Sequence, residues 1–224
     1  MHFKDVQATL VRSLTTLKGA LSLITNPSNT TSVYELEDGL RYKKATRLSI
    51  EFIKSQPEIK PLLTERYLVG DPDLDALLNY PQNSLGYRYA SHLKASGFDP
   101  HFYRDIKVED DTSYLFLRRR QTHDIWHIIT GLGTDVASEV GLKAFELAQT
   151  RSPLSALLIA GGLVRTLFDS PEELGYLLDR IAVGYRMGSQ AKPFLAQKWE
   201  QHWEKPIEQW REELNVQVPP AYTP

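Results

Sequence analysis

Apolar residues recur every three or four positions along most of this chain, which is the spacing of one face of an α-helix. Near the start of the chain, the apolar positions are Phe3, Val6, Leu10, Leu14, Leu17, Leu21 and Ile24. Near its end, the same spacing connects Trp199, Trp203, Ile207, Trp210 and Leu214, with Pro206 as a break. The pattern contains no internal repeat, low-complexity tract or obvious linker. It predicts an all-α fold in which residues 1–224 form a single multi-helix domain.

Capping residues mark where several of these helices begin and end. In "GDPDLDALLNYP" we expect Asp71 to cap a helix, Pro72 to occupy its first position and Pro81 to stop it. The segment "SLGYRYASHLKASG" predicts a second helix, which runs from a cap at Ser84 to Gly97.

Two further segments carry turn or capping signals. "SPEELGYLLDRIAVGYRMG" predicts a long helix with Ser170 and Glu173 as a capping box and Gly188 as its end. "SVYELEDGLRY" is the one segment that could hold strands, because its Asp38-Gly39 pair favours the turn of a short β-hairpin.

The segment "DTSYLFLRRRQTHDIWHIIT" contains the residues most suggestive of chemistry. It predicts one helix that begins at Asp110 or Asp111 and closes near Gly131. At roughly 100° per residue, His123 and His127 lie on the same face, one turn apart. Both imidazoles could therefore reach a single metal ion.

A glycine-rich turn then returns the chain towards these histidines. Gly131 and Gly133 in "TGLGTD" should end the first helix, and Thr134 or Asp135 can cap a second one. In such a hairpin Glu139 can face the end of the first helix. Asp124, next to His123, could be a ligand, a partner that orients an imidazole, or a general base.

These four residues suit a metal ion, although a buried hydrogen-bonded cluster would use the same groups. The chain has no cysteine, so the ligands must be imidazole and oxygen. Two histidines with one or two carboxylates suit Zn²⁺, Fe²⁺ or Mn²⁺, whereas Mg²⁺ normally prefers oxygen alone.

Three arginines, Arg118, Arg119 and Arg120, directly precede the histidines. Consecutive residues of a helix point in different directions, so at most two can face the site. The run is either a solvated charged surface or an anion subsite, since the guanidinium fork matches carboxylate and phosphate oxygens.

Composition narrows the classes of function. The formal net charge is −2, which argues against nucleic-acid binding, because that usually requires a strongly basic face. The longest apolar run, "ALLIAGGLV", is about half of what a bilayer span requires. The first residues lack a signal-peptide layout, so we expect a soluble or peripheral protein made where it works.

At this point the sequence resembles a known family. "HDIWH", followed by eleven residues and Glu139, matches the His-Asp-x-x-His…Glu signature of the coenzyme Q biosynthesis protein 4 family. "YPQNSLGYRYASHL" and "YLFLRRRQTHD" are similar to the segments before the signature, and "EVGLKAFELAQTRSP" to the one after it. Departures are Arg119 in place of an aromatic residue, Ser138 in place of glycine, and Arg151-Ser152 in place of Gly-Leu, which suggest a divergent bacterial member.

The resemblance implies a mostly helical protein that dimerises and acts in ubiquinone biosynthesis at a membrane surface. Its implied partners are a polyprenylated benzenoid intermediate and other quinone-pathway proteins, at the inner face of a bacterial membrane. The reaction that the resemblance implies replaces the carboxylate of the benzenoid ring with a hydroxyl. The implied metal ligands are His123, Asp124, His127 and Glu139, with zinc favoured over iron, manganese or magnesium. Asp124 and Glu139 are the catalytic candidates, and Arg118 and Arg120 are weaker candidates for an acidic headgroup.

Two other functions stay open. The first is a non-catalytic scaffold that binds prenyl lipid and organises other quinone-pathway enzymes. The second, more remote, is a zinc hydrolase, because "HDIWH" superficially resembles His-Glu-x-x-His. Asp124 is one methylene shorter than the glutamate that such hydrolases use as a base.

Overall fold

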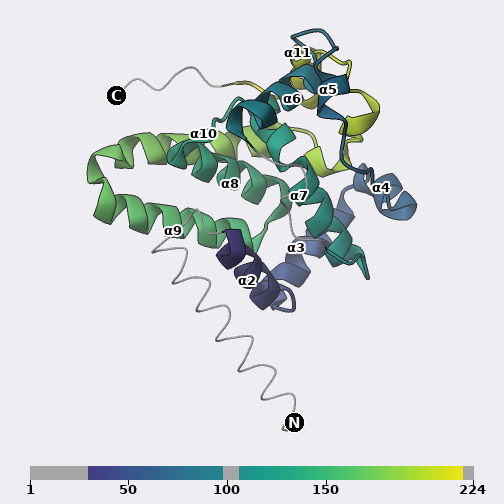
Figure 1. The fold of residues 1–224 in the computed structure, drawn as a ribbon. Helices are drawn as coiled ribbons and strands as arrows, with labels where there is room; N and C mark the ends of the chain where they lie inside the picture. Colours follow the sequence, from purple (N-terminus) through teal and green to yellow (C-terminus); the bar gives the residue numbers. More distant parts are fainter. Residues whose placement is uncertain (1–29, 98–105, 219–224) are drawn as a thin grey trace. The chain divides into compact units, whose positions relative to one another are not determined.

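The computed structural model describes residues 30–97 and 106–218 of the chain. Within these ranges the protein consists of helices and short 3-10 turns without a β-strand, which confirms the all-α prediction (Figure 1). The elements are α2 (Thr30–Leu40), α3 (Lys44–Ser55), α4 (Ile59–Glu65), α5 (Leu74–Leu77), α6 (Leu85–Ser96), α7 (Asp111–Thr130), α8 (Val136–Thr150), α9 (Pro153–Asp169), η2 (Pro171–Glu173), α10 (Leu174–Gln190), η3 (Phe194–Ala196), η4 (Trp199–Gln201) and α11 (Ile207–Leu214).

Two further sequence predictions concern a helix near the start of the chain and the absence of a membrane-spanning segment. The helix predicted over the first residues, from Phe3 to Ile24, lies outside the described residues. Among those that are described, no helix combines the length and the apolar character that crossing a bilayer requires.

The chain divides into two compact units, each assembled from separate stretches of sequence. Among the described residues, the first unit contains 30–52 and 135–189, and therefore α2, most of α3, and α8 to α10. The second contains 53–97, 106–134 and 190–218, and therefore α4 to α7, η3, η4 and α11. That the whole chain forms one domain stays a prediction.

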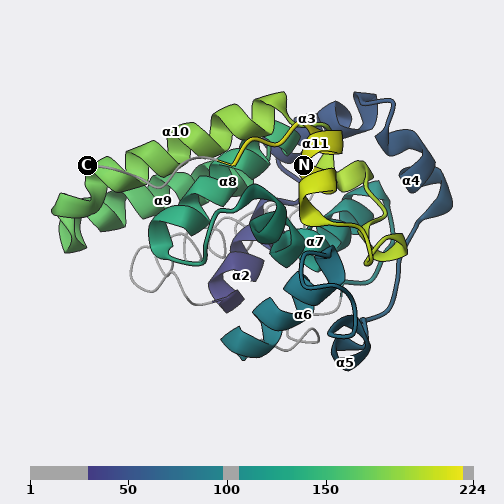
Figure 2. The same cartoon turned by 90° about the horizontal axis from the view of Figure 1, so that it is seen from above.

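In the first unit, glycines let α8, α9 and α10 pack closely side by side (Figures 1 and 2). A Cβ atom on Gly184 of α10 would lie only 2.0 Å from the carbonyl oxygen of Gly141 in α8. A Cβ on Gly162 of α9 would lie 2.6 Å from Cγ2 of Val140 on another side of α8. Helix α8 therefore approaches both neighbours more closely than larger residues would allow.

The segment predicted as a possible β-hairpin is instead helical. Helix α2 runs through the Asp38-Gly39 pair, and its Leu36 packs against Leu154 of α9. Val33 and Leu40 join the same cluster. Positions 33, 36 and 40 follow helical spacing, so burial of this face outweighs the turn preference of Asp-Gly. The hairpin prediction is wrong.

The core of the second unit is aromatic. Trp126 of α7 contacts Phe194 edge-on, with ring centroids 5.5 Å apart, and Phe194 contacts Trp199 in the same way at 5.3 Å. Trp199 then packs on Trp210 of α11 at 4.6 Å. Such aromatic pairs contribute about 0.5–1.5 kcal/mol each beyond the area that they bury. Trp199 and Trp210, near the end of the chain, are therefore core residues. The predicted helical spacing holds only from Ile207 onward, in α11, because Trp199 lies in a 3-10 turn.

The first turn of α6 is held by the C-terminal part of the same unit. Ser84 caps the helix, and the backbone N–H groups of Leu85 and Gly86 donate to the carbonyl oxygens of Lys205 and Trp203 at 2.9 and 2.8 Å. These bonds satisfy N–H groups that a helix start leaves without an internal partner. The predicted boundaries of this helix, Ser84 and Gly97, are both confirmed.

Two predicted helix starts differ from the structure. Helix α5 is a single turn capped by Asp73, whose side chain accepts from the N–H groups of Asp75 and Ala76, so Asp71 is not the cap. At Ser170 no side-chain cap bond forms, and Pro171–Glu173 make a 3-10 turn before α10 begins.

The predicted end of α10 is also wrong. Gly188 lies inside the helix, which continues to Gln190. A Cβ on Gly188 would lie 2.5 Å from the carbonyl oxygen of Phe145 in α8. This glycine therefore serves close packing between two helices and not helix termination.

Candidate metal centre

Helix α7 carries both candidate histidines near its C-terminal end. The Asp110 side chain accepts from the Ser113 N–H at 2.7 Å, and the Ser113 hydroxyl accepts from the Asp110 N–H at 2.9 Å, which forms a capping box. The helix closes at Gly131, whose φ is +70° and whose N–H donates to the carbonyl oxygen of His127. Because the helix is uninterrupted, His123 and His127 share one face, as predicted.

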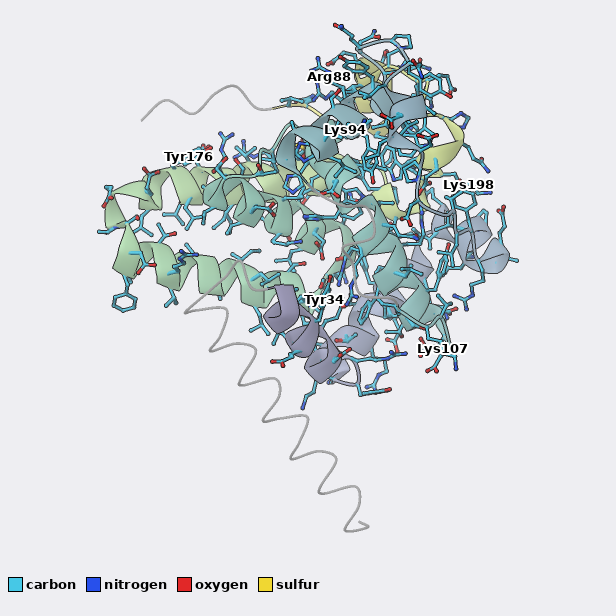
Figure 3. The ribbon with its side chains drawn as sticks, in the orientation of Figure 1. Tyr34, Arg88, Lys94, Lys107, Tyr176 and Lys198 are labelled. Atoms are coloured by element: carbon cyan, nitrogen blue, oxygen red, sulfur yellow. The ribbon has the colours of Figure 1, made fainter. Side chains whose placement is uncertain are left out.

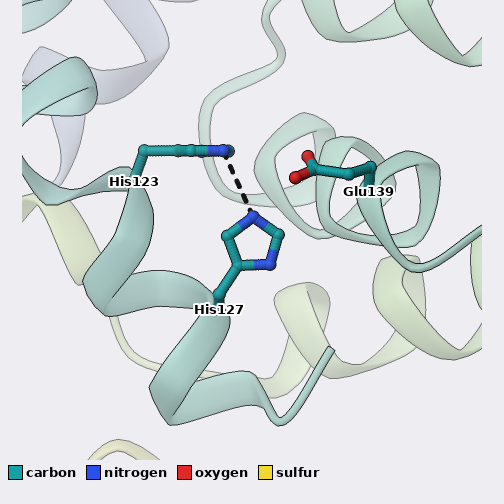
Figure 4. Close-up of side chains that lie close together, drawn as sticks. All are labelled: His123, His127 and Glu139. Atoms are coloured by element: carbon teal, nitrogen blue, oxygen red, sulfur yellow. Dashed lines mark hydrogen bonds between the residues drawn. The ribbon is translucent and has the colours of Figure 1, made fainter. Parts of the chain in front are cut away.

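The two imidazoles meet edge to face. Their Nε2 atoms lie 3.2 Å apart and their planes make an angle of 84° (Figure 4). His127 is buried, and its other ring nitrogen, Nδ1, lies 2.9 Å from the carbonyl oxygen of Leu132. A carbonyl can only accept, so Nδ1 carries the proton and Nε2 of neutral His127 presents a lone pair towards His123.

Glu139 follows on the next helix. The Asp135 side chain caps α8 by accepting from the Ser138 N–H at 3.0 Å, which confirms one of the two predicted caps. Glu139 lies half-buried in the first turn of this helix. One imidazole nitrogen from each of His123 and His127 and one carboxylate oxygen of Glu139 lie within 4.8 Å of one another (Figure 4).

The chemistry of this donor group fits a divalent transition metal. Two imidazole nitrogens and one carboxylate oxygen, with coordination positions left over, suit Zn²⁺, Fe²⁺ or Mn²⁺ better than Mg²⁺. Because the His127 lone pair points at His123, a proton or a cation must lie between the two rings. With a proton, His123 donates to His127 and the group is a hydrogen-bonded cluster.

Asp124 is not part of the three-residue group. It is half-buried on α7, and its negative charge faces Tyr89 of α6. Burial raises the pKa of the Tyr89 hydroxyl, and the charges of Asp124 and then Asp71 and Glu200 raise it further. Tyr89 therefore keeps its hydroxyl proton. Asp124 as a ligand or base stays a prediction.

The arginines before the histidines have different surroundings. Arg118 is buried, and its Nη1 and Nη2 atoms donate to Glu200 at 2.7 and 3.3 Å. Its guanidinium also lies over the ring of Tyr67, as does the ammonium of Lys198, which is labelled in Figure 3. Arg120 is half-buried. Binding of an acidic headgroup by either arginine stays a prediction.

Two contributors to the site were missed from the sequence. One is the carbonyl oxygen of Leu132, which sets the protonation pattern of His127. The other is Arg211, whose side chain donates to the last carbonyl groups of α7. The glycines of the turn indicated that the chain reverses, but nothing in the sequence indicates which carbonyl or which distant arginine completes it.

Comparison with known proteins gives a consistent family. A family model described as "Coenzyme Q (ubiquinone) biosynthesis protein Coq4" matches residues 5–220. A crystal structure of a proposed ubiquinone biosynthesis protein from Nostoc punctiforme PCC 73102 is similar, with 34% identity and a TM-score of 0.82. The similarity covers 92% of this chain and 99% of that one.

Curated relatives extend the comparison to eukaryotes. The mitochondrial ubiquinone biosynthesis protein COQ4 of Zygosaccharomyces rouxii is 35% identical over 66% of this chain and 45% of its own length. The COQ4 homolog of Aedes aegypti is 31% identical over 72% of this chain and 57% of its own length. The chain thus spans about half the length of these two relatives.

Proposed function

This chain belongs to the coenzyme Q (ubiquinone) biosynthesis protein Coq4 family. We propose that it acts in ubiquinone biosynthesis as a metal-dependent enzyme. Its substrate would be a benzenoid ring that carries a polyprenyl tail and a carboxylate. His123, His127 and Glu139 would hold a divalent metal, with zinc the first candidate. The protein would form a homodimer at the inner face of a bacterial membrane, where it would work among other quinone-pathway proteins.

The arrangement of the two imidazoles is the observation that supports a metal most strongly. The Nδ1 atom of His127 donates its proton to the carbonyl oxygen of Leu132, so the Nε2 lone pair of His127 is directed at the Nε2 atom of His123. A carbonyl that orients the outer nitrogen of a histidine is the usual companion of metal ligation through the inner one. Glu139 supplies the negative charge that a divalent cation requires.

The proposed reaction exchanges one ring substituent for another. The bond between the ring carbon and the carboxylate breaks, carbon dioxide leaves, and a hydroxyl forms at the same carbon. The exchange removes two electrons from the substrate, so it needs an oxidant such as dioxygen. A bound divalent cation would supply a positive charge beside the ring substituents, and iron or manganese would also permit oxygen-dependent chemistry.

The surrounding residues would position the ring and move protons. Asp124 is the candidate base, because it directly follows His123 on α7. Tyr89, held neutral next to Asp124, can donate a hydrogen bond to an oxygen of the ring. Arg118 forms a buried ion pair with Glu200. Arg120 is therefore the candidate for binding the carboxylate of the substrate ring.

A prenyl-lipid-binding scaffold is the second candidate function. It is favoured by apolar side chains exposed along α9, namely Leu157, Val164, Leu167 and Phe168. A scaffold should bind a prenylated ring equally well with and without Glu139. An enzyme should bind it in both forms and lose turnover in a Glu139→Gln variant.

Elemental metal analysis of the purified protein is the primary test. We expect a near-stoichiometric transition metal in the native protein and its loss in His123→Ala and Glu139→Ala variants. His202, which lies on the C-terminal segment outside the group, gives the matched control, and His202→Ala should keep the metal. Asp124→Asn should also keep the metal if Asp124 is a base and not a ligand.

The opposite result would reject the metal proposal. If the native protein holds no metal after incubation with Zn²⁺, Fe²⁺ and Mn²⁺, the two histidines form a hydrogen-bonded pair. The scaffold function would then lead.

A further inference from the structure

The C-terminal end of α7, where His127 lies, is closed by an arginine from α11. The Nε atom of Arg211 donates to the carbonyl oxygen of Ile129 at 2.9 Å, and its Nη2 atom donates to that of Ile128 at 3.1 Å. Its Nη1 atom pairs with Glu208 at 2.6 Å on the more exposed side. One guanidinium therefore binds two of the last carbonyl groups of the helix.

This contact provides hydrogen-bond donors and a positive charge at the C-terminal end of α7. The last four carbonyl groups of an α-helix have no internal partner, and the negative end of the helix dipole lies there. A cation that donates to these carbonyls satisfies both, and bonds from charged donors are stronger than neutral ones. The arginine arrives from about eighty residues farther along the chain, so α7 does not close by local capping alone.

The same segment also packs against the glycine at which α7 ends. Gly131 has a φ of +70°, and a Cβ atom placed there would lie 2.7 Å from Cγ1 of Val218. Nη2 of Arg211 would lie 3.6 Å from the same position. Residues 207–218, which we call the C-terminal latch, thus contact the turn through Arg211 and Val218.

Two hydrogen bonds of His127, one of its backbone and one of its side chain, are made within this turn. The carbonyl oxygen of His127 accepts from the Gly131 N–H at 2.9 Å, and its Nδ1 atom donates to the Leu132 carbonyl at 2.9 Å. Residues 127–132 therefore form one hydrogen-bonded turn around the imidazole. A shift of the carbonyls that Arg211 holds would change where Leu132 lies and so how His127 is oriented.

We propose that Arg211 is a positioning residue for the metal centre, which holds the last turn of α7 so that the Leu132 carbonyl can orient His127. The part of this proposal that concerns metal affinity rests on the proposed function. The part that concerns the turn does not, because the hydrogen bonds of Arg211 to the α7 carbonyl groups involve no metal. Arg211 itself touches neither a ligand atom nor a substrate.

The test compares four variants with the native protein. Arg211→Ala removes both carbonyl bonds, and Arg211→Lys keeps the charge with fewer donors. Glu208→Gln is the matched control in the latch, because it removes the charge of the exposed partner and leaves the two carbonyl bonds in place. Tyr114→Phe is the matched control in α7, since the Tyr114 hydroxyl donates to the Leu62 and Tyr67 carbonyls at the other end of the helix.

Besides the urea midpoint of unfolding, two quantities are measured: the Zn²⁺ dissociation constant, by competition with a chelator, and the hydrogen-exchange rate of the Gly131 amide without metal. Arg211→Ala should weaken Zn²⁺ binding by about 10- to 100-fold, the usual effect of losing a residue that orients a ligand. It should also speed exchange of the Gly131 amide by about tenfold or more. Arg211→Lys should fall between, and Glu208→Gln should stay within about twofold of native.

The outcomes separate this proposal from the proposed function. Tyr114→Phe should lower the urea midpoint while leaving both quantities unchanged, so loss of stability alone does not imitate the effect. If Arg211→Ala lowers the urea midpoint with native affinity and native Gly131 exchange, Arg211 is structural and the inference is overturned. If the native protein binds no metal, the proposed function fails, and the Gly131 exchange rate still decides whether Arg211 holds the turn.

Discussion

At the scale of single residues, α7 is tied to its unit by buried charge as well as by apolar packing. Arg118 has a side chain that is 1% exposed, and Glu200, its partner, is 11% exposed. Removing one member of such a pair leaves an uncompensated charge away from water, which costs about 3–5 kcal/mol. We expect Arg118→Ala to lower the free energy of unfolding by at least 3 kcal/mol, roughly, in urea titrations.

An exposed ion pair of the same chain provides the control for Arg118. Arg165 and Asp169 of α9 pair at 3.1 Å, with side chains that are 35% and 61% exposed. Water screens such a pair, so Arg165→Ala should change the free energy of unfolding by about 0.5 kcal/mol or less. Equal effects of the two substitutions would show that the Arg118–Glu200 pair is solvated in solution.

Asp111 is one source of the pH dependence of stability. Hydrogen bonds from Lys54, and then from Arg66, lower the pKa of Asp111 against the opposing effect of its burial. A lowered folded-state pKa means that the ion pairs stabilise the protein above the unfolded pKa of about 3.9. This stabilisation is lost as the pH falls through the folded-state pKa.

An Asp111→Asn variant tests that assignment. Its urea midpoint should lie below that of the native protein at about pH 7, and the two midpoints should converge at about pH 2. Midpoints that differ by the same amount throughout this range would mean that the Asp111 carboxylate contributes by its shape and not by its charge.

At the scale of helices, two glycines predict opposite responses to the same substitution. In Gly184→Ala the new methyl group meets the backbone of Gly141 at 2.0 Å, so α8 and α10 must separate. Such overpacking typically costs about 1–3 kcal/mol. In Gly161→Ala the methyl group meets nothing within 4 Å, and alanine favours a helix over glycine by about 1 kcal/mol.

Thermal unfolding of the two variants measures this contrast. The melting temperature should fall for Gly184→Ala and stay level or rise for Gly161→Ala. A rise in both variants would mean that α8 and α10 are not in backbone contact in solution.

Helix ends were predictable from sequence where their signals are local. Asp110, Gly131 and Asp135 bound α7 and α8 as predicted, because a cap acts on backbone groups within three residues of itself. Gly188 was misassigned because its role depends on Phe145, which lies on another helix. The distance along the chain between a residue and its partner thus explains the failure at Gly188. Asp71 and Ser170, by contrast, failed as caps although a cap is a local signal.

At the scale of the whole molecule, distance along the chain also limits what could be predicted of the candidate site. The pairing of His123 with His127 depends only on the helical repeat, so sequence spacing predicted it. The Leu132 carbonyl and the Arg211 side chain depend on how the chain turns and returns, which spacing does not encode. Residues that could be metal ligands were therefore predictable, and the groups that orient them were not.

Metal binding should stabilise the protein as a whole. An ion that binds the folded chain and not the unfolded one adds about 2.7 kcal/mol at 100 times its dissociation constant. For a protein of this size that corresponds to a rise in melting temperature of about 5–11 °C. Zn²⁺ should produce this rise in the native protein and in His202→Gln, whereas Glu139→Gln, which loses the charged ligand, should show little of it. An equal rise in Glu139→Gln would place the ion at other residues, and no rise in any of the three would leave His123 and His127 as a hydrogen-bonded pair.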